Sequence, residues 1–416
     1  MSIPELVAPA GSFETLEAAL NAGADAVYLG PRQLGLRASD ADFDGTGLRN
    51  AIERVRLRGK KVYVALNALL HGPDIASAAH VVRELQKTPP NAVIISDLGL
   101  IESVKEAGLP FHVSTQCSIT NSAAAKAWVL LGAKRIILAR ELALAEVATI
   151  VREAGAEIEV FAHGAMCVAY SGRCLMSDYL AKRGGNRGEC AQACRWPVKI
   201  GREGFDDSVF TLEENNNATF ILNSRDLCTL PFLNELAATG VKAIKIEGRN
   251  KGAHYITVVV QTYRSALNAL ASEGDSWKVR PEWVEALSSV THRTYTSGFY
   301  KELSYNADFA RDRKNRPLIT PGRQNDESAD FIQTSILCGV IRETLSDGRA
   351  VVDVRARIHE GAMVSLFSPD KGAYLEGTRL TAMTAVDGTS LAEAHPNRIV
   401  LCRFDGPVSA GSLVRL

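Results

Sequence analysis

Short apolar runs recur along the first 265 residues, and each is separated from the next by a helical stretch. There are eight such runs, at residues 6–9, 26–29, 61–66, 92–96, 111–115, 135–139, 158–162 and 243–247. Because they are apolar on both faces, they are typical of parallel strands covered by helices on each side. Ser12 is placed to cap the first helix, and Gly23 and Gly155 fit helix ends. The pattern predicts an α/β fold, a (β/α)8 TIM-like barrel, with a doubly wound open sheet as the alternative.

The regular spacing breaks between about residues 163 and 242. This segment holds five of the eight cysteines and a helix from about Pro231. It also contains a predicted β-hairpin, with strands at residues 196–200, 209–212 and 219–222. Insertions after barrel strands lie at the C-terminal face of a barrel, where active sites are built. We therefore expect residues 1–304 to form a catalytic barrel domain with a cysteine-rich insertion at its mouth.

A second domain is predicted after a polar segment. Residues 305–334 contain proline, glycine and a run of charged side chains at 311–316, which indicates a linker. Runs rich in β-forming residues follow, separated by Gly and Asp turns, at residues 336–341, 350–354, 363–367, 399–404 and 412–416. Short strands separated in this way predict a small antiparallel β-barrel or sandwich over residues 335–416.

Overall charge and hydropathy narrow the classes of function. Lys plus Arg and Asp plus Glu both number 47, so the chain lacks a global basic field for nucleic acid, although a local basic face remains open. The N-terminus does not resemble a signal peptide, and no apolar run approaches the roughly 18 residues of a membrane span. We expect a cytoplasmic protein with no membrane partner. Neither a Walker loop nor a dinucleotide fingerprint is present.

The insertion is unusually rich in thiols. Its five cysteines are Cys167, Cys174, Cys190, Cys194 and Cys228. In a reducing compartment, thiols gathered in this way suit a soft or borderline metal, so an iron–sulfur cluster and zinc are the candidates. Structural zinc sites usually have short Cys pairs at both ends, which are missing here. We predict an iron–sulfur cluster, with zinc and buried structural thiols as the alternatives.

Polar side chains lie at or just beyond the C-terminal ends of the predicted strands. In a barrel, these positions converge on one mouth. The predicted substrate-binding residues are Asn67, Asp97, Gln116, Arg140 and Arg249. The predicted catalytic residues are His163, which could donate a proton, and Glu247, which could act as an acid or base or hold Arg249. Singly, each could instead be structural; together they predict an active site.

Basic residues accumulate in the same insertion. Arg183, Arg187, Arg195 and Lys199 give it a local positive charge. RNA phosphates could bind such a patch, although a solvated face would have the same composition.

Residues 159–177, EVFAHGAMCVAYSGRCLMS, resemble the signature of the peptidase U32 (collagenase-like) family. Other blocks agree with it: ELVAPAG at residues 5–11, AGADAVYLG at 22–30, HVSTQ at 112–116 and IKIEGR at 244–249. The resemblance covers about residues 4–305, and the small C-terminal domain is similar to that of longer family members.

The resemblance implies a function. The family includes bacterial proteins needed for 5-hydroxyuridine in tRNA and 5-hydroxycytidine in ribosomal RNA. It also includes a pair that hydroxylates ubiquinone precursors without oxygen through [4Fe–4S] clusters, and prephenate is implicated as the hydroxyl donor. A barrel with an added C-terminal domain is most similar to the tRNA members.

The implied activity is therefore oxygen-independent hydroxylation of RNA, forming 5-hydroxyuridine in the tRNA anticodon loop. It would use a [4Fe–4S] cluster, a prephenate-like small-molecule donor and an electron-transfer partner. One alternative is a peptidase with a cysteine or a metal-bound water as nucleophile; for cysteine catalysis, His163 and Cys167 form the only nearby pair. The others are a component of ribosomal RNA or ubiquinone-precursor hydroxylation and a non-catalytic iron–sulfur RNA-binding module.

The resemblance also implies a ligand set. By the cysteine spacing of the cluster-bearing quinone member, the ligands are Cys167, Cys174, Cys190 and Cys228. The gaps here are six, fifteen and thirty-seven residues, and each longer gap is one residue shorter than in that member. Its partner protein uses a Cys-x3-Cys pair, so Cys194 could replace Cys190. Arg140 and Arg249 would then bind the two carboxylates of a prephenate-like donor.

Overall fold

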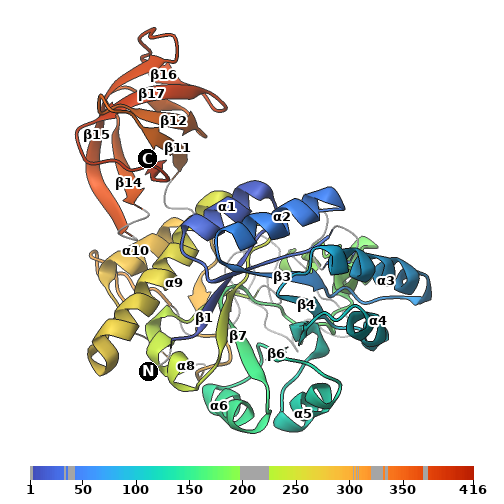
Figure 1. Cartoon of the computed structure of the whole chain (residues 1–416). Helices are drawn as coiled ribbons and strands as arrows, with labels where there is room; N and C mark the ends of the chain where they lie inside the picture. The colour runs from blue at the N-terminus through green and yellow to red at the C-terminus, as the bar shows by residue number, and fades with distance from the viewer. Residues whose placement is uncertain are drawn as a thin grey trace, which may run out of the picture.

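The computed structural model describes residues 3–31, 34–35, 43–196, 224–302, 304–305, 307, 309–319, 331–332, 336–368 and 373–416. The predicted hairpin, apart from Trp196, lies outside these ranges, and so does Lys199. The described residues form an α/β barrel and a smaller all-β domain, which Figure 1 colours from blue to yellow and from orange to red.

Eight parallel strands form the larger barrel. They are β1 (Glu5–Pro9), β2 (Ala26–Leu29), β3 (Lys61–Leu66), β4 (Ala92–Ile95), β5 (Phe111–Val113), β6 (Arg135–Ile137), β7 (Glu157–Ala165) and β9 (Ala243–Ile246). Each strand pairs with its neighbour, and β9 closes the ring by pairing with both β1 and β7. The predicted TIM-like barrel is confirmed, and the closure excludes an open sheet.

Helices surround this barrel on its outer side (Figure 1). They are α1 (Phe13–Asn21), α2 (Thr46–Leu57), α3 (Gly72–Lys87), α4 (Ile101–Glu106), α5 (Ser122–Leu130), α6 (Leu144–Glu153), α9 (Ala253–Glu273) and α10 (Pro281–Ser289). The backbone amide of Thr15 donates to Ser12 Oγ at 3.2 Å, so Ser12 caps α1 as predicted. No helix in the described part of the chain is long and apolar enough to cross a membrane.

The insertion between β7 and β9 adds short elements beside the barrel. They are α7 (Met176–Ala181), β8 (Asp226–Cys228), α8 (Leu233–Ala238) and three described 3-10 turns, Gly185–Arg187, Ala193–Arg195 and Leu230–Phe232. Strand β8 runs antiparallel to β7, with Cys228 opposite His163. The two-residue strand β10 (Tyr295–Thr296) pairs with β8, so the sheet continues beyond the closed ring.

The C-terminal domain is a closed antiparallel barrel. Its strands are β11 (Leu337–Thr344), β12 (Ala350–Val354), β14 (Met363–Ser368), β15 (Ala373–Ala385), β17 (Ile399–Phe404) and β18 (Leu413–Arg415), and a small ribbon pairs β13 (Ile358–His359) with β16 (Glu393–Ala394). The predicted small β-barrel is confirmed, but β15 was not predicted. The domain contacts the larger barrel, because Arg355 pairs with Glu14 on α1 at 2.7 Å and Phe367 is buried in the barrel domain's hydrophobic core.

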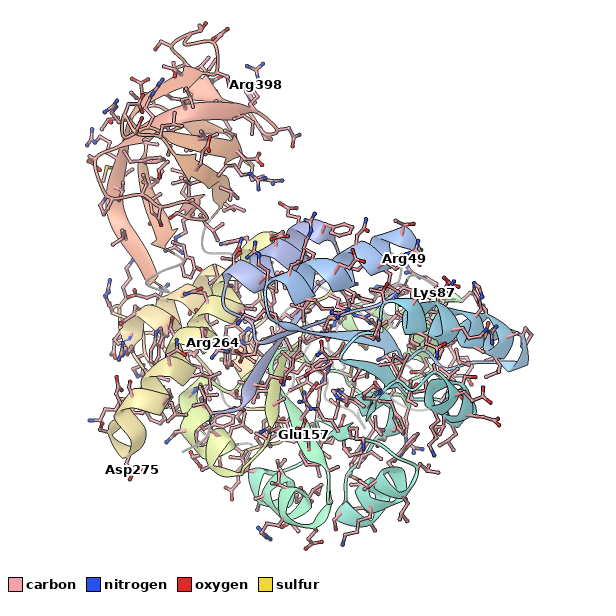
Figure 2. The ribbon with its side chains drawn as sticks, viewed as in Figure 1. Arg49, Lys87, Glu157, Arg264, Asp275 and Arg398 are labelled. Carbon is pink, nitrogen blue, oxygen red and sulfur yellow. The ribbon has the colours of Figure 1, made fainter. Side chains whose placement is uncertain are left out.

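A network of buried charges fills the N-terminal end of the α/β barrel. The Arg135 guanidinium, on a side chain that is 2% exposed, lies 2.8 Å from Glu5, 3.0 Å from Glu159 and 2.7 Å from Glu157 (labelled in Figure 2). Burial opposes the ionisation of Glu159, but Lys245 and Arg135 hold the pKa of this carboxyl below its usual value. The sequence analysis did not predict this network, which connects the closed end of the barrel to the floor of its mouth through Lys245.

Candidate active site at the mouth of the barrel

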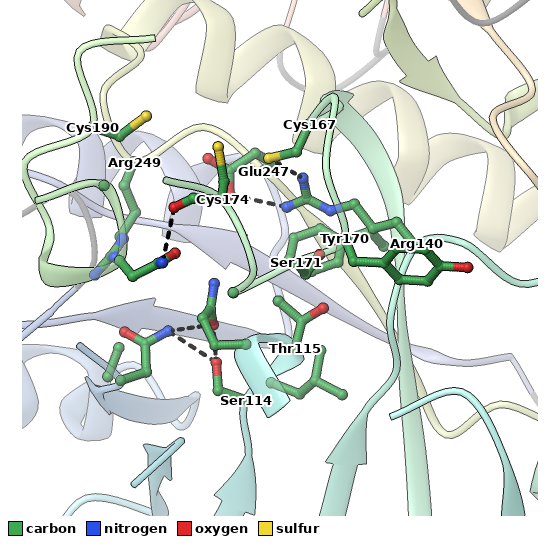
Figure 3. A pocket seen from close by; sticks show the side chains of 18 of the residues that line it. Ser114, Thr115, Arg140, Cys167, Tyr170, Ser171, Cys174, Cys190, Glu247 and Arg249 are labelled. Carbon is green, nitrogen blue, oxygen red and sulfur yellow. Dashed lines mark hydrogen bonds and ion pairs between the residues drawn. The ribbon is translucent and has the colours of Figure 1, made fainter. Parts of the chain in front are cut away.

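A cavity of about 150 Å³ opens at the C-terminal ends of the barrel strands. Its floor includes Tyr28, Phe161 and Lys245, from β2, β7 and β9. Its outer wall comes from the cysteine-rich insertion (Figure 3). The expected position of the insertion over the barrel mouth thus corresponds to a cavity in which barrel and insertion side chains meet.

Four thiols line this cavity: Cys167, Cys174, Cys190 and Cys194. Figure 3 shows the sulfur atoms of the first three around the same opening. Burial raises the pKa of the Cys194 thiol, Arg195 lowers it, and the nearby Cys167, Cys190 and Cys174 raise it again. These electrostatic interactions show that Cys194 lies close to the other three thiols of the cavity.

Cys228 lies elsewhere. Its side chain is fully buried on β8, with Sγ 3.8 Å from the Tyr263 hydroxyl, and burial raises its thiol pKa to about 12. Of the four ligands that the resemblance implies, Cys228 is therefore the one that does not line the cavity, and the fourth thiol there is Cys194. Two isolated thiols, Cys117 and Cys402, also have pKa values raised to about 12 by burial.

The chemistry of this donor set fits a thiolate-bound metal centre, because iron–sulfur clusters and zinc are both held by four cysteines. No three His, Cys, Asp or Glu side chains among the described residues already form a group that could hold a metal ion. The thiols thus share one cavity without surrounding a single point.

A guanidinium lies beside the thiols. Arg140 Nη1 donates to the Ala165 carbonyl at 2.8 Å and lies 3.9 Å from Cys167 Sγ. The guanidinium carbon is 3.9 Å from the centre of the Phe161 ring, and Nη2 is 3.9 Å from Glu247 Oε2. Arg140 Nε has no hydrogen-bond partner although it is buried. Arg140 is therefore held rigidly while part of its hydrogen-bonding capacity is unused.

Arg249 and Lys245 complete the positive side of the cavity. A Cβ at Gly30 would lie 3.0 Å from Arg249 Nη1 and 2.7 Å from the Ala65 carbonyl oxygen, so glycine leaves room for this guanidinium. The Lys245 ammonium lies 4.0 Å from the centre of the Tyr28 ring and 3.0 Å from Glu159 Oε1. Burial lowers the pKa of Lys245, and Glu159 opposes this shift.

Lys245 is a site residue that the sequence analysis missed. The signal was present in IKIEGR, because Lys245, Glu247 and Arg249 alternate along the end of one strand. Alternate residues of a strand share a face, and all three line the cavity. Glu247 and Arg249 were predicted as site residues, and the same alternation identifies Lys245.

Amide and hydroxyl groups form another side of the cavity. Asn67 Nδ2 donates to Ser114 Oγ and to Gln116 Oε1, both at 3.0 Å. The Cys167–Cys174 loop packs on this side through Gly172, whose φ is +81°, and a Cβ there would lie 2.2 Å from the Gln116 carbonyl oxygen. Only glycine allows this contact, which seats the thiol loop on the barrel.

Two predicted site residues lie outside the cavity. Asp97 accepts hydrogen bonds from the Gly99 amide at 2.9 Å and the Leu70 amide at 3.3 Å, so it caps a turn. His163 is buried, and burial lowers its pKa well below the usual value. Asp97 and His163 are therefore the two predicted site residues that the structure does not bring to the cavity.

Among the described residues, His163 has ring contacts with aromatic side chains and not with the Cys167 thiol, its partner in the peptidase alternative. Its ring is packed among Tyr255, Tyr263 and Tyr295, with centroid distances of 6.0, 5.5 and 5.1 Å. Its Nδ1 lies 3.4 Å from the Tyr263 hydroxyl. The side chain near the Cys167 thiol is instead Arg140.

The predicted basic patch separates into different environments. Arg195 is buried and donates to the Met166 carbonyl at 3.1 Å, and Arg187 pairs with Asp74 at 2.8 Å. Arg183 is exposed. Arg195 is thus structural, whereas Arg183 is available at the surface.

The fold and this cavity define an α/β-barrel protein with an enzyme-like site at its mouth. The sequence profile of peptidase family U32 matches residues 11–308, and that of the peptidase family U32 C-terminal domain matches residues 333–415. The chain belongs to peptidase family U32.

Relatives within the family have different names. The chain is 29% identical over 418 residues to tRNA hydroxylation protein P1 of Bacillus subtilis, covering 99% of this chain and 94% of that protein. It is 35% identical over 308 residues to a collagenase of Porphyromonas gingivalis, covering 71% of this chain and 73% of that protein. It is 34% identical over 304 residues to the 23S rRNA 5-hydroxycytidine synthase of Escherichia coli, covering 71% of this chain and 45% of that protein.

Proposed function

We propose that this protein is a cytoplasmic enzyme of oxygen-independent RNA hydroxylation that forms 5-hydroxyuridine in the tRNA anticodon loop. The observation that carries the proposal is the cavity at the barrel mouth, where four thiols meet three buried cations. The similarity to a tRNA hydroxylation protein over 99% of this chain supports tRNA as the substrate.

A [4Fe–4S] cluster is the proposed cofactor, and Cys167, Cys174, Cys190 and Cys194 are its proposed ligands. Each thiolate of such a cluster binds a different iron atom, whereas four thiolates around zinc bind one ion and must lie closer together. The four thiols that line the cavity are the donors that such a cluster needs. When bound, the cluster would supply one-electron chemistry from an electron-transfer partner.

The hydroxyl donor is proposed to be a small dicarboxylic acid such as prephenate. Arg140 and Arg249 can bind carboxylates through forked hydrogen bonds, and the Arg140 Nε has no partner of its own. Lys245 adds an ammonium group at the floor of the cavity. Glu247 holds Arg140 at 3.9 Å and accepts from the Tyr28 hydroxyl at 3.4 Å, which orients both groups toward a bound acid.

Nucleoside mass spectrometry of tRNA from a strain lacking this protein tests the proposal. We expect 5-hydroxyuridine and its derivatives to disappear, and to return with the native chain but not with Cys190→Ala. Iron and sulfide assays on protein purified without oxygen should find about four of each per chain in the native protein alone. Unchanged tRNA in the deletion strain would overturn the proposal, and a loss of 5-hydroxycytidine from ribosomal RNA instead would reassign the substrate.

The relationship to a collagenase gives a peptidase as the second candidate. Its test is gelatin degradation by the purified native protein and by Cys167→Ala. Because His163 does not contact Cys167, we expect no cysteine-dependent degradation.

A further inference from the structure

The outer surface of the insertion exposes large apolar and aromatic side chains beside the cavity. They are Tyr170, Leu175, Tyr179, Leu180 and Trp196. Among the described residues, five Phe, Tyr or Trp side chains are exposed, and three of them lie within residues 166–196. Soluble proteins seldom gather such groups on one segment unless the surface binds something.

The arrangement of α7 connects this surface to the cavity. Met176 and Ser177 line the cavity, and Ser177 Oγ accepts a hydrogen bond from the Ala191 amide at 2.9 Å. Tyr179 and Leu180, on the outer side of the same helix, are 73% and 51% exposed. Tyr170 is both exposed and part of the cavity lining, and Figure 3 shows its hydroxyl pointing away from the thiols.

The charge of this surface is positive although the whole chain is neutral. Residues 166–196 contain five Lys or Arg and two Asp or Glu. One acidic residue, Asp178, accepts from the Gly185 amide at 3.3 Å. Lys182 and Arg183 are exposed and form no ion pair with any described residue. The surface therefore presents cations beside exposed aromatic rings.

We propose that this surface, made of Tyr170, Tyr179, Lys182 and Arg183, holds a single-stranded RNA loop. The proposal rests on the proposed function and identifies how that substrate is bound. Aromatic rings stack on unpaired bases and cations bind the backbone, which is how proteins recognise RNA loops. Tyr170 stacks on the base that enters the cavity, and Tyr179, Lys182 and Arg183 hold the neighbouring nucleotides.

RNA fits this surface better than a protein partner does. Protein interfaces are depleted of lysine and of charge at their centres, whereas here unpaired cations lie beside the apolar groups. Duplex RNA fits less well, because its stacked bases are not available to aromatic side chains.

Fluorescence anisotropy tests the proposal with the full chain and two RNA probes, an anticodon stem–loop with uridine in its loop and a blunt duplex of the same stem. Tyr179→Ala should weaken stem–loop binding about tenfold, and Tyr179→Phe should restore it, because the ring supplies the stacking. Lys182→Glu with Arg183→Glu should weaken binding further and reduce the salt dependence by about two ions.

Lys126→Glu with Lys134→Glu is the matched control. Both lysines are exposed, but Lys126 lies on α5 and Lys134 precedes β6 at the opposite end of the barrel. This control should bind the stem–loop like the native protein. All variants should keep the native melting temperature and iron content, because the changed side chains lie at the surface.

If Tyr179→Ala and the Lys182–Arg183 double variant bind the stem–loop with native affinity, the proposal that this surface binds RNA is wrong. An equal loss of stem–loop affinity in the Lys126–Lys134 control would also overturn the proposal. So would variants that lose binding to a protein partner while they keep their affinity for RNA. The nucleoside assay distinguishes this failure from failure of the proposed function. If the deletion removes 5-hydroxyuridine but the variants bind RNA normally, only the proposed RNA-binding surface is wrong. If the variants lose RNA affinity but the deletion leaves tRNA unchanged, the surface is supported and the proposed reaction is wrong.

Discussion

The two ends of the α/β barrel differ in how they compensate buried charge. At the N-terminal end, Arg135 has three carboxylate partners within 3.0 Å. At the mouth, Arg140 is also buried, but it has Glu247 at 3.9 Å and an Nε without a hydrogen bond. Lys245 lies between the two ends, with Glu159 beneath it and the cavity beside it.

This difference shows how one fold divides its interior between stability and binding. A buried charge with complete partners holds its neighbours in place, whereas incomplete compensation costs stability. The mouth carries this cost, and the Arg140 Nε is a donor there that a ligand can satisfy. The N-terminal end therefore fits a structural support, and the mouth fits the proposed binding site.

The largest expected effect is on metal content, where the cavity thiol Cys194 should differ from the buried thiol Cys228. Cys194→Ala should abolish iron and sulfide in protein purified without oxygen, whereas Cys228→Ala should retain both, because only Cys194 lines the cavity. Metal analysis and the visible absorption spectrum measure this. Retained iron in Cys194→Ala together with lost iron in Cys228→Ala would restore the ligand set implied by the family resemblance.

The next effect tests the support at the N-terminal end. Glu159→Gln should lower the free energy of unfolding by about 3–5 kcal/mol, because it leaves Arg135 and Lys245 buried with incomplete compensation. Glu157→Gln is the matched control, since Glu157 also pairs with Arg135 but its side chain is 45% exposed. It should cost about 1 kcal/mol or less. Similar losses in urea denaturation would show that burial does not distinguish the two pairs.

A smaller effect is expected in how the free energy of unfolding depends on pH. Burial, with Arg135 and Lys245 nearby, lowers the pKa of His112 well below 6.5. The unfolded chain therefore binds a proton that the folded chain does not, and stability falls as the pH falls below about 6.5. Each such histidine contributes up to about 1.4 kcal/mol per pH unit.

His112→Phe should reduce this slope between pH 6.5 and 5, measured by urea denaturation at a series of pH values. An unchanged slope in His112→Phe would place the titrating groups elsewhere.

The smallest expected effect concerns the seat of the thiol loop. Gly172→Ala should cost about 1–2 kcal/mol and reduce the iron retained, because its Cβ meets the Gln116 carbonyl. Gly155 has a similar φ, +74°, but open space around its Cβ position. Gly155→Ala should therefore have a comparable or smaller thermal effect without loss of iron. Equal iron content in both variants would mean that the loop can move without releasing the site.

Much of the fold could be predicted because its determinants are local. Eight apolar runs corresponded to the eight barrel strands, and Ser12 to the cap of α1. Strand β15 was missed because Gly377 and charged side chains interrupt its apolar pattern, and its long pairings with β14 and β17 supply the missing signal.

The site was predicted where strand ends converge and missed where the backbone departs from regular alternation. Arg140, Glu247 and Arg249 line the cavity as expected. His163 does not, because the pairing of β7 with β9 shifts register between Phe161 and His163. Phe161 remains on the cavity side, and the irregularity turns His163 toward the tyrosines of α9.

The sequence by itself determined the barrel, the location of its mouth and the enrichment of thiols there, since strand periodicity and chain order are local properties. Only the tertiary structure decided that Cys194 and not Cys228 joins the other thiols, and that Lys245 lies between Glu159 and the cavity. These choices depend on which residues distant in sequence become neighbours when β9 closes the ring and the insertion folds over it. Spacing along the chain cannot specify them, because they follow from the packing of the whole barrel.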